Sequence, residues 1–377
     1  MTPAHATHHQ RRRGVALLTT LAVLILLLLL TSGAAHLALG DARRGRDGPV
    51  LATTTAAADA GAYSLLRDWN TFDFDSMAVG DTIPSVRLPA GDAWAAVRGR
   101  RVSAMAWWIT STGFAPDTTQ PGYTRRQVNL VLRQAIPELA TSAALTARDS
   151  VTVRGRGSVS GTDTVTGPWG AGCPPGTAVA GVALADTSKA RHGTVLGAPP
   201  LAVDPRAGLL ATYAAFGPAT WQRLTTRAAH VLSGGAVVSP APRLTGTTCD
   251  ASVTSNWGEP IGTGPCARYA PVIWVRGDLT LNGGRGQGVL LVDGDLHVQN
   301  GAEFHGVVIA RDDVVSGPGG GALFGAVLAA DSVRGPGDHS LIGDDLLVRR
   351  SSCTAAGVLR RAAPLVPVAR RAWAELQ

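Results

Sequence analysis

The C-terminal half of the sequence repeats aspartate at the ends of short aliphatic runs: Asp278, Asp293, Asp295, Asp312, Asp313 and Asp331. Carboxylates repeated in this way can line a calcium ladder, and two of them can act as the acid and base of glycoside hydrolysis. Aspartate also caps turns, because its side chain accepts hydrogen bonds from nearby backbone N–H groups. The spacing lacks the nonapeptide period of a calcium ladder, so we expect turn caps.

Other residue types that support catalysis or ligand binding lack the context that their chemistry requires. The glycine-rich run 283–288 precedes a strand-like segment, whereas a phosphate-binding loop opens a helix. His297 and His305 have no third ligand at metal-binding spacing. The sequence contains no GxSxG elbow, no Walker sequence and no recognisable Ser-His-Asp arrangement. We therefore expect a protein that is not an enzyme and that holds no cofactor and no metal.

The chain contains four cysteines: Cys173, Cys249, Cys266 and Cys353. None forms a CxxC pair, and no histidine lies near them at zinc-finger spacing, so a metal site is disfavoured. Disulfides are permitted if the domain is exported. We predict the pair Cys249–Cys266, which would close a short loop and contribute about 3 kcal/mol. The pair Cys173–Cys353 stays open as a second bridge.

A repeat occupies the C-terminal half. Aliphatic runs begin at Val272, Val289, Val307 and Ala326, at intervals of 17, 18 and 19 residues. Each run is followed by a corner rich in glycine and aspartate and then by a second short strand. This period matches one coil of a parallel β-solenoid, whose strands stack on those of the next coil. Segments 148–153 and 181–186 are earlier traces of the pattern, and 343–348 is an irregular last coil.

The elements that would position these residues begin with an apolar N-terminal segment. No charged residue occurs from Val15 to Leu39, and a helix of this length reaches roughly 30 Å or more, enough to cross a bilayer core. Residues 56–69 are rich in alanine, which favours a helical continuation. Three residues between the two parts are expected to break or bend the helix: Gly45, Gly48 and Pro49.

Three interpretations of the apolar segment compete. A secretory signal peptide would be cleaved within Ser32–Ala35, although the apolar core continues past that point. A simple membrane anchor would keep Arg11–Arg13 in the cytoplasm. A prepilin-type leader would be cut after Gly14, and its apolar segment would be retained in the mature protein.

Residues Arg13-Gly14-Val15-Ala16-Leu17-Leu18-Thr19 resemble the start of type IV pilin-related proteins. The resemblance implies cleavage between Gly14 and Val15 by prepilin peptidase, followed by N-methylation of Val15. Thr19 stands where most major pilins carry a glutamate, a departure shared with PilX-type minor pilins and K-type pseudopilins. The runs 256–260 and 286–296 are similar to the C-terminal part of pilus-assembly proteins with a PilX-type N-terminus.

Composition adds limits on fold and partners. The chain has 377 residues, with 46 glycines, 23 prolines and few aromatics, a mix that favours short strands and turns. The net charge of +7 is spread thinly and lacks interleaved aromatics, which disfavours nucleic-acid binding. We predict a mainly β fold, with an N-terminal transmembrane, pilin-like α-helix before a head rich in parallel β-solenoid and carrying a small helical insertion.

The predicted organisation has six segments. They are a basic leader (1–14), the transmembrane and pilin-like helix (15–70), a β-rich pilin-like region (71–145), early solenoid strands with a helix at 221–232 (146–248), the solenoid (249–350) and a C-terminal tail or cap (351–377).

The resemblance and the repeat together predict a minor pilin-like subunit for assembly of a type IV pilus or a type II secretion pseudopilus. Its expected partners are other pilins, through the N-terminal helix, and prepilin peptidase. It would be a single-pass protein of the bacterial inner membrane, with its head in the periplasm, or part of a surface filament. The alternative is a secreted or membrane-anchored β-solenoid that binds a ligand or acts on polysaccharide.

Overall fold

The computed structural model describes residues 13–67, 77–83, 85–115, 125–140, 143–165, 167–170, 173–331, 339–368 and 373–376. The chain forms two compact units, one of Met1–Arg133 with Pro367–Gln377 and one of Gln134–Val366. The second unit is therefore inserted into the sequence of the first. Of the predicted leader, residues 1–12 lie outside the described part of the chain.

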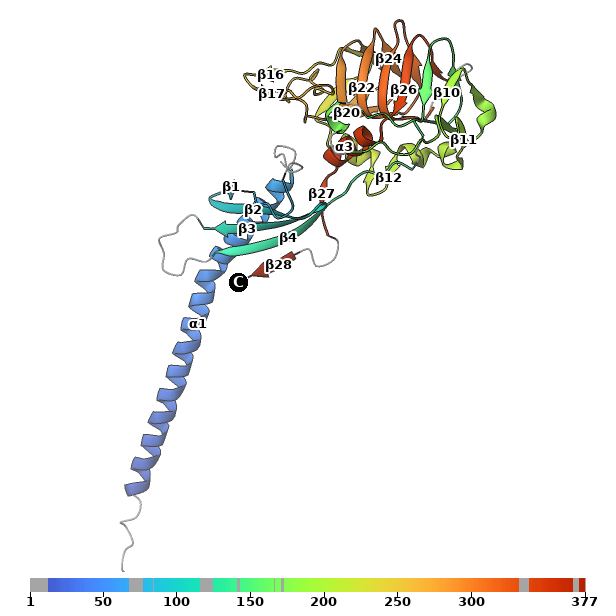
Figure 1. The fold of residues 1–377 in the computed structure, drawn as a ribbon. Coiled ribbons are helices and arrows are strands. Elements are labelled where there is room, and N and C mark those ends of the chain that lie inside the picture. The colour runs from blue at the N-terminus through green and yellow to red at the C-terminus, as the bar shows by residue number, and fades with distance from the viewer. Residues whose placement is uncertain are drawn as a thin grey trace, which may run out of the picture. The chain divides into compact units, whose positions relative to one another are not determined.

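The first unit consists of one long helix, α1 (Arg13–Arg67), and an antiparallel sheet (Figure 1). The sheet has the order β1-β2-β3-β4, and both β27 and β28 also pair with β4. Side chains of β3 alternate between buried and more exposed positions, as expected for a sheet covered on one face. The strands are β1 (Val86–Ala90), β2 (Ala93–Ser103), β3 (Ala106–Phe114), β4 (Arg126–Gln134), β27 (Leu365–Pro367) and β28 (Trp373–Leu376).

Helix α1 is continuous, so the expected break at Gly45, Gly48 and Pro49 is wrong. A proline inside a helix removes one backbone hydrogen bond and costs about 3 kcal/mol. This part of α1 is open to solvent around Gly48 and Pro49, so water can satisfy a carbonyl that loses its partner. The turns that follow are anchored on the sheet, and this tertiary packing outweighs the local preference of the three residues.

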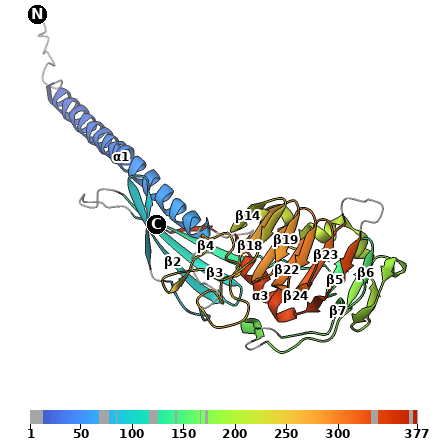
Figure 2. The same ribbon diagram turned by 90° about the horizontal axis from the view of Figure 1, so that it is seen from above.

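The second unit contains two long parallel ladders whose strands alternate along the chain (Figure 2). The pairs Val272↔Val289, Val289↔Val307 and Val307↔Ala326 confirm the predicted alignment of the repeat. The first ladder comprises β5 (Leu145–Ala147), β7 (Ser158–Ser160), β8 (Val182–Leu184), β10 (Thr194–Leu196), β11 (Leu201–Val203), β14 (His230–Ser233), β18 (Val272–Arg276), β20 (Arg285–Val292), β22 (Ala302–Ala310), β24 (Gly321–Ala329) and β26 (Leu346–Arg350).

The second ladder comprises β15 (Ala236–Val238), β19 (Leu279–Asn282), β21 (Leu296–Gln299), β23 (Val314–Ser316), β25 (Ser340–Ile342), β6 (Val151–Val153) and β9 (Ala190–Arg191), in this spatial order. Aliphatic side chains from the two ladders form one core between them. Columns such as Val275, Val292 and Ala310 stack from strand to strand within it.

Strands β5, β8 and β11 come early in the sequence, yet in the stack they lie beyond β24. The sequence does not predict this order. Strand β24 pairs along its first half with β26 and along its second half with β5. Strand β5 lies near the start of the second unit and β26 near its end, so two segments nearly 200 residues apart in sequence pair with the same strand, β24. From β5 the stack continues outward through β8 to β11.

The outer face of the first ladder is covered by segments that connect or end the unit. Helix α3 (Ser352–Ala362) and the crossing segment 204–229 place Val358, Phe216 and Leu224 against Leu291 and Ile309. The crossing segment contains η5 (Pro205–Gly208), η6 (Leu210–Tyr213), β12 (Ala215–Phe216), β13 (Ala219–Thr220) and α2 (Trp221–Thr225). The sheet is therefore buried on both faces, as parallel sheets generally are.

The predicted helix over 221–232 is much shorter in the structure. Helix α2 ends at Thr225, and His230–Ser233 form β14, which pairs in parallel with β18. The helical period of this stretch is real as far as Leu224, which is buried under the crossing segment. Beyond it, strand pairing with the ladder overrides the local pattern.

A loop closed by a disulfide packs a tryptophan into the core between the ladders. Trp257 is fully buried in that core and meets Phe304 edge to face, with 6.1 Å between ring centroids. Its carbonyl accepts a 2.7 Å hydrogen bond from the N–H of Gln287 on β20. The loop also carries the hairpin β16 (Leu244–Thr245) and β17 (Thr248–Cys249), and the Cys249–Cys266 bridge closes it.

Candidate functional site

The N-terminal half of α1 is an uncovered apolar rod. Leu18–Leu39 comprises 22 residues with a mean hydropathy of 2.3, and none of its most apolar stretch is buried. Leu28, for example, is 71% exposed. At 1.5 Å per residue the segment is about 33 Å long, which suits the apolar core of a bilayer or of a helix bundle. The described chain thus has one helix that is long and apolar enough to span a membrane.

The C-terminal half of α1 is mounted on the antiparallel sheet. Thr54, Ala58, Ala62 and Leu65 are buried on one helix face and pack against β1, β2 and β3. Small side chains on this face allow the helix backbone to approach the sheet closely. The spacing of these residues, three to four apart, is that of a single helical stripe.

Two glycines make this close contact possible. A Cβ placed on Gly113 of β3 would lie 1.9 Å from the carbonyl oxygen of Thr54, and one on Gly61 would lie 2.5 Å from the Cβ of Ala95. Neither space can accept a methyl group without moving backbone. The packing of α1 on the sheet therefore depends on glycine on both sides of the contact, Gly61 on α1 and Gly113 on β3.

The predicted processing bond joins Gly14 and Val15, in the first turn of α1. The structure describes the backbone there and not the side chains of residues 13–17. Cleavage and N-methylation at this bond remain predictions. Thr19 lies four residues further along the same helix.

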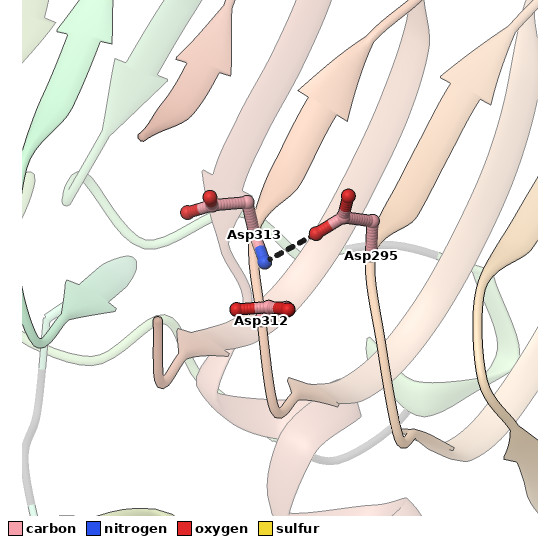
Figure 3. A group of neighbouring side chains, drawn as sticks. All are labelled: Asp295, Asp312 and Asp313. Atoms are coloured by element: carbon pink, nitrogen blue, oxygen red, sulfur yellow. Dashed lines mark hydrogen bonds between the residues drawn. The ribbon is translucent and has the colours of Figure 1, made fainter. Parts of the chain in front are cut away.

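The recurring aspartates lie at the corners between the two ladders. The Asp278 carboxylate accepts a hydrogen bond from the N–H of Asp295 at 2.9 Å, and the Asp295 carboxylate accepts one from the N–H of Asp313 at 3.0 Å (Figure 3). The Asp313 carboxylate in turn accepts from the hydroxyl of Ser340, also at 3.0 Å. The Asp278 and Asp295 carboxylates thus each hold the backbone of the next corner, which is the geometry of turn caps, whereas Asp313 contacts a side chain.

The same corner brings three carboxylates together. Oxygens of Asp295, Asp312 and Asp313 lie within 4.8 Å of one another. Asp295 and Asp313 already accept hydrogen bonds from protein groups. The predicted role as turn caps therefore accounts for Asp278 and Asp295. His297 and His305 do not join this cluster, since they lie on different ladders, on β21 and β22.

His305 is a buried titratable group. It is 1% exposed and stacks on Phe324, with 4.6 Å between the two rings. Burial lowers the pKa of His305 to about 4, although the Glu303 carboxylate 3.8 Å away opposes the shift. The ring that stacks on His305 belongs to the neighbouring strand β24, and this tertiary contact has no local signal in the sequence.

The cysteines form two disulfides, Cys249–Cys266 and Cys173–Cys353. The second bridge ties the segment around Cys173 to the start of α3. The Asp163 carboxylate supports the same junction by accepting from the N–H of Ser352 at 2.7 Å. Trp169 of η3 (Gly167–Gly170) lies nearby over Gly357 and donates to the Gln287 side chain.

Comparison with known proteins gives one match. No protein-family model and no curated protein matches this chain. Among solved structures, the chain is similar to the competence-associated pilin ComZ from Thermus thermophilus, with 13% identity over 86% of this chain and 97% of that one. The TM-score is 0.18, a value that carries no inference about fold or function.

The close packing of α1 on β3 predicts that substitution of Gly113 strongly lowers stability. Gly113→Ala should destabilise the first unit by about 1–3 kcal/mol, because the new methyl group collides with the Thr54 carbonyl. Thermal unfolding of the full chain in detergent, together with limited proteolysis of α1, measures this effect. Gly48→Ala is the matched control, since nothing lies within 4 Å of its Cβ position. Equal melting temperatures of the two variants would contradict this packing of α1 on the sheet.

Turn capping by Asp295 predicts that its alanine and asparagine variants differ in stability. Asp295→Ala should cost about 1–3 kcal/mol, because the N–H of Asp313 loses a charged acceptor. Asp295→Asn keeps an oxygen at the same place and should recover at least half of that loss. Melting of both variants with calcium and with EDTA separates a cap from a cation site. A calcium-dependent rise in melting temperature that Asp295→Asn abolishes would refute the cap.

Burial of His305 predicts a loss of stability in acid. The folded-state pKa lies below the ordinary value of 6.5, so the unfolded chain binds the proton more tightly. The associated stability is fully present above pH 6.5 and is lost as the pH falls toward 4, by about 3 kcal/mol. Chemical denaturation from pH 7 to 4 measures this slope. His305→Gln should flatten it, whereas His297→Gln should leave it unchanged.

Proposed function

We propose that this protein is a minor pilin-like subunit that takes part in assembly of a type IV pilus or a type II secretion pseudopilus, and that it is not an enzyme. One observation carries the proposal: a single helix leaves a 22-residue apolar segment uncovered and packs its other half on an antiparallel sheet. A helix arranged in this way can be held in a bilayer first and then move, with its sheet, into a bundle of similar helices.

The continuity of α1 supports retention of the apolar segment. A secretory signal peptide is removed and need not share a rigid element with the mature domain. Here the apolar half and the mounted half are one uninterrupted helix from Arg13 to Arg67. Cleavage at Gly14–Val15 would leave nearly all of it in the mature protein, whereas cleavage near Ala35 would leave no membrane-spanning length.

Thr19 favours a minor subunit. In the pilins that this N-terminus resembles, a glutamate at the equivalent place is thought to pair with the amino terminus of a neighbouring subunit. A threonine hydroxyl carries no charge for that pairing. A subunit of this kind suits the tip of a filament or its priming rather than repetition along it.

The head is proposed to be a parallel β-solenoid. Support comes from alternation of strands between two parallel ladders and from one aliphatic core enclosed between them. Before assembly the protein would be a single-pass protein of the bacterial inner membrane, with this head in the periplasm. Its partners would be prepilin peptidase and the apolar helices of other pilins, and no nucleic acid.

A secreted or anchored solenoid that binds a ligand or acts on polysaccharide is the competing proposal. It shares the β-rich head and differs at the N-terminus. The described acid cluster already has a structural role in turn capping, so the pilin-like proposal accounts for more of the chain.

Mass spectrometry of the mature N-terminus tests the proposal. We expect an N-methylated Val15 in cells that contain prepilin peptidase, and an uncleaved chain when the peptidase gene is deleted. Gly14→Leu should block cleavage because the bulky side chain cannot replace glycine at the scissile bond, while Gly33→Leu should not. A start near Ala35 or His36 would support secretion, and an intact Met1 would support a plain anchor. Either result would overturn the proposal.

A further inference from the structure

The antiparallel sheet of the first unit has two faces of different chemistry. Helix α1 packs on one face, where Val97 and Ile109 are buried. The opposite face, here called the outer face, carries the side chains that alternate with these along β1 to β4. Its arginines and its exposed tryptophan are Arg87, Arg98, Arg100, Arg133 and Trp108. The side of the sheet away from α1 is therefore rich in guanidinium groups.

The outer face is positively charged. All four of its arginines are exposed, and β1 to β4 contain no Asp or Glu. Among the described residues, Arg98, Arg100 and Arg133 form no ion pair. The strand registers place the four arginines on successive rows across the sheet, so the charge extends roughly 20 Å along the strands. A face of this kind attracts an extended anionic ligand.

Trp108 lies within this line of charge, and its ring is held in place. It pairs across the sheet with Arg100 and is 45% exposed. Its indole N–H lies 3.1 Å from the Thr110 hydroxyl oxygen and 3.2 Å from Oδ1 of Asn129, so it donates to the sheet rather than to solvent. The exposed part of the ring is therefore an apolar surface of fixed orientation, with guanidinium, hydroxyl and amide groups beside it.

The anionic surface of a bilayer lies too far from the outer face. Gly61 of α1 packs against Ala95 and Val97, so the helix carries this part of the sheet about 33 Å beyond Leu39. The headgroup layer extends only roughly 5–8 Å beyond the hydrocarbon core. Lipid headgroups therefore do not reach the outer face when Leu18–Leu39 spans the membrane.

A nucleic acid also fits the outer face poorly. Proteins that bind single strands stack successive bases on aromatic rings. Trp108 is the one exposed aromatic side chain among the described residues of this face. The ring of Trp94 is already covered, because the Phe114 ring lies 3.9 Å from it between centroids and the Arg87 guanidinium lies 4.0 Å from its centroid. A single ring beside polar side chains suits one sugar ring better than a row of bases.

We propose that the outer face binds an acidic polysaccharide, with one pyranose ring on Trp108 and carboxylates of the same chain paired with Arg98 and Arg100. The C–H groups of a pyranose ring are apolar and weakly positive, so they pack on the negative face of an indole. Guanidinium groups bind carboxylates through two parallel hydrogen bonds. Thr110 and Asn129 suit sugar hydroxyls, whereas the centre of a protein interface is more apolar. This binding needs only the sheet and does not depend on the proposed role in pilus assembly.

Full-length protein in phosphatidylcholine nanodiscs, which carry no net charge, tests the proposal with polygalacturonate and alginate as acidic polysaccharides. Isothermal titration calorimetry should show saturable binding that weakens as salt is added, because salt screens the carboxylate pairs. Methyl-esterified polygalacturonate keeps the rings without the charge, and polyglutamate keeps the charge without the rings. Each should bind at least tenfold more weakly than polygalacturonate.

Three variants test whether the outer face is the binding site. Arg98→Ala and Arg100→Ala change exposed side chains and should fold normally, and each should weaken binding at least fivefold. Trp108→Ala should weaken it at least tenfold, whereas Trp108→Phe keeps a ring and should retain most of the affinity. Arg191→Ala, at an exposed position of β9, is the matched control for charge. Tyr63→Ala is the control for an exposed aromatic, since Tyr63 is 54% exposed on α1.

Four outcomes would overturn the proposal. The first is no saturable binding of either polysaccharide up to millimolar sugar. The second is binding that Arg98→Ala and Arg100→Ala leave unchanged, and the third is equally tight binding of polyglutamate. The fourth is tighter binding of single-stranded DNA, or of vesicles that contain phosphatidylglycerol, because the face would then select a different anion.

Discussion

Stacking of aliphatic side chains in register along parallel strands is the interaction on which the second unit depends. The column through Val275, Val292 and Ala310 repeats one kind of side chain at one strand spacing, about 4.8 Å. Each coil buries its apolar face only through its neighbours, so the burial of any coil depends on the next one. The aspartate caps follow from the same geometry, because they align the corners that link the two ladders.

Much of this ladder can be predicted from local sequence. The intervals of 17 to 19 residues give the correct partners for Val272, Val289, Val307 and Ala326 because the contacts are between consecutive coils. The pairing of both β26 and β5 with β24 cannot be predicted in this way. These two strands are far apart in sequence, and nothing in either strand identifies the other. The period of the repeat identifies strands that pair with the next repeat along the sequence. It does not identify a strand, such as β5, that comes from a distant part of the sequence.

Two predictions about helices are wrong for a related reason, since both depend on contacts with distant parts of the sequence. Pro49 predicts a break, and residues 221–232 predict a helix, because both judgements rest on local propensity. Packing of Ala58 and Leu65 on the sheet carries α1 through the proline, and pairing of β14 with β18 ends α2 early. The buried His305 belongs with these cases, since the ring of Phe324 that stacks on it comes from another strand, β24. The apolar rod itself was predictable, because its composition alone determines it.

The apolar half of α1 indicates how the chain can associate. Leu18–Leu39 presents side chains around a helix whose backbone hydrogen bonds are internal, so it can enter lipid or a helix bundle without unpaired polar groups. The other half of α1 is already packed on the sheet through Thr54, Ala58 and Ala62, so association through the apolar half leaves that packing in place.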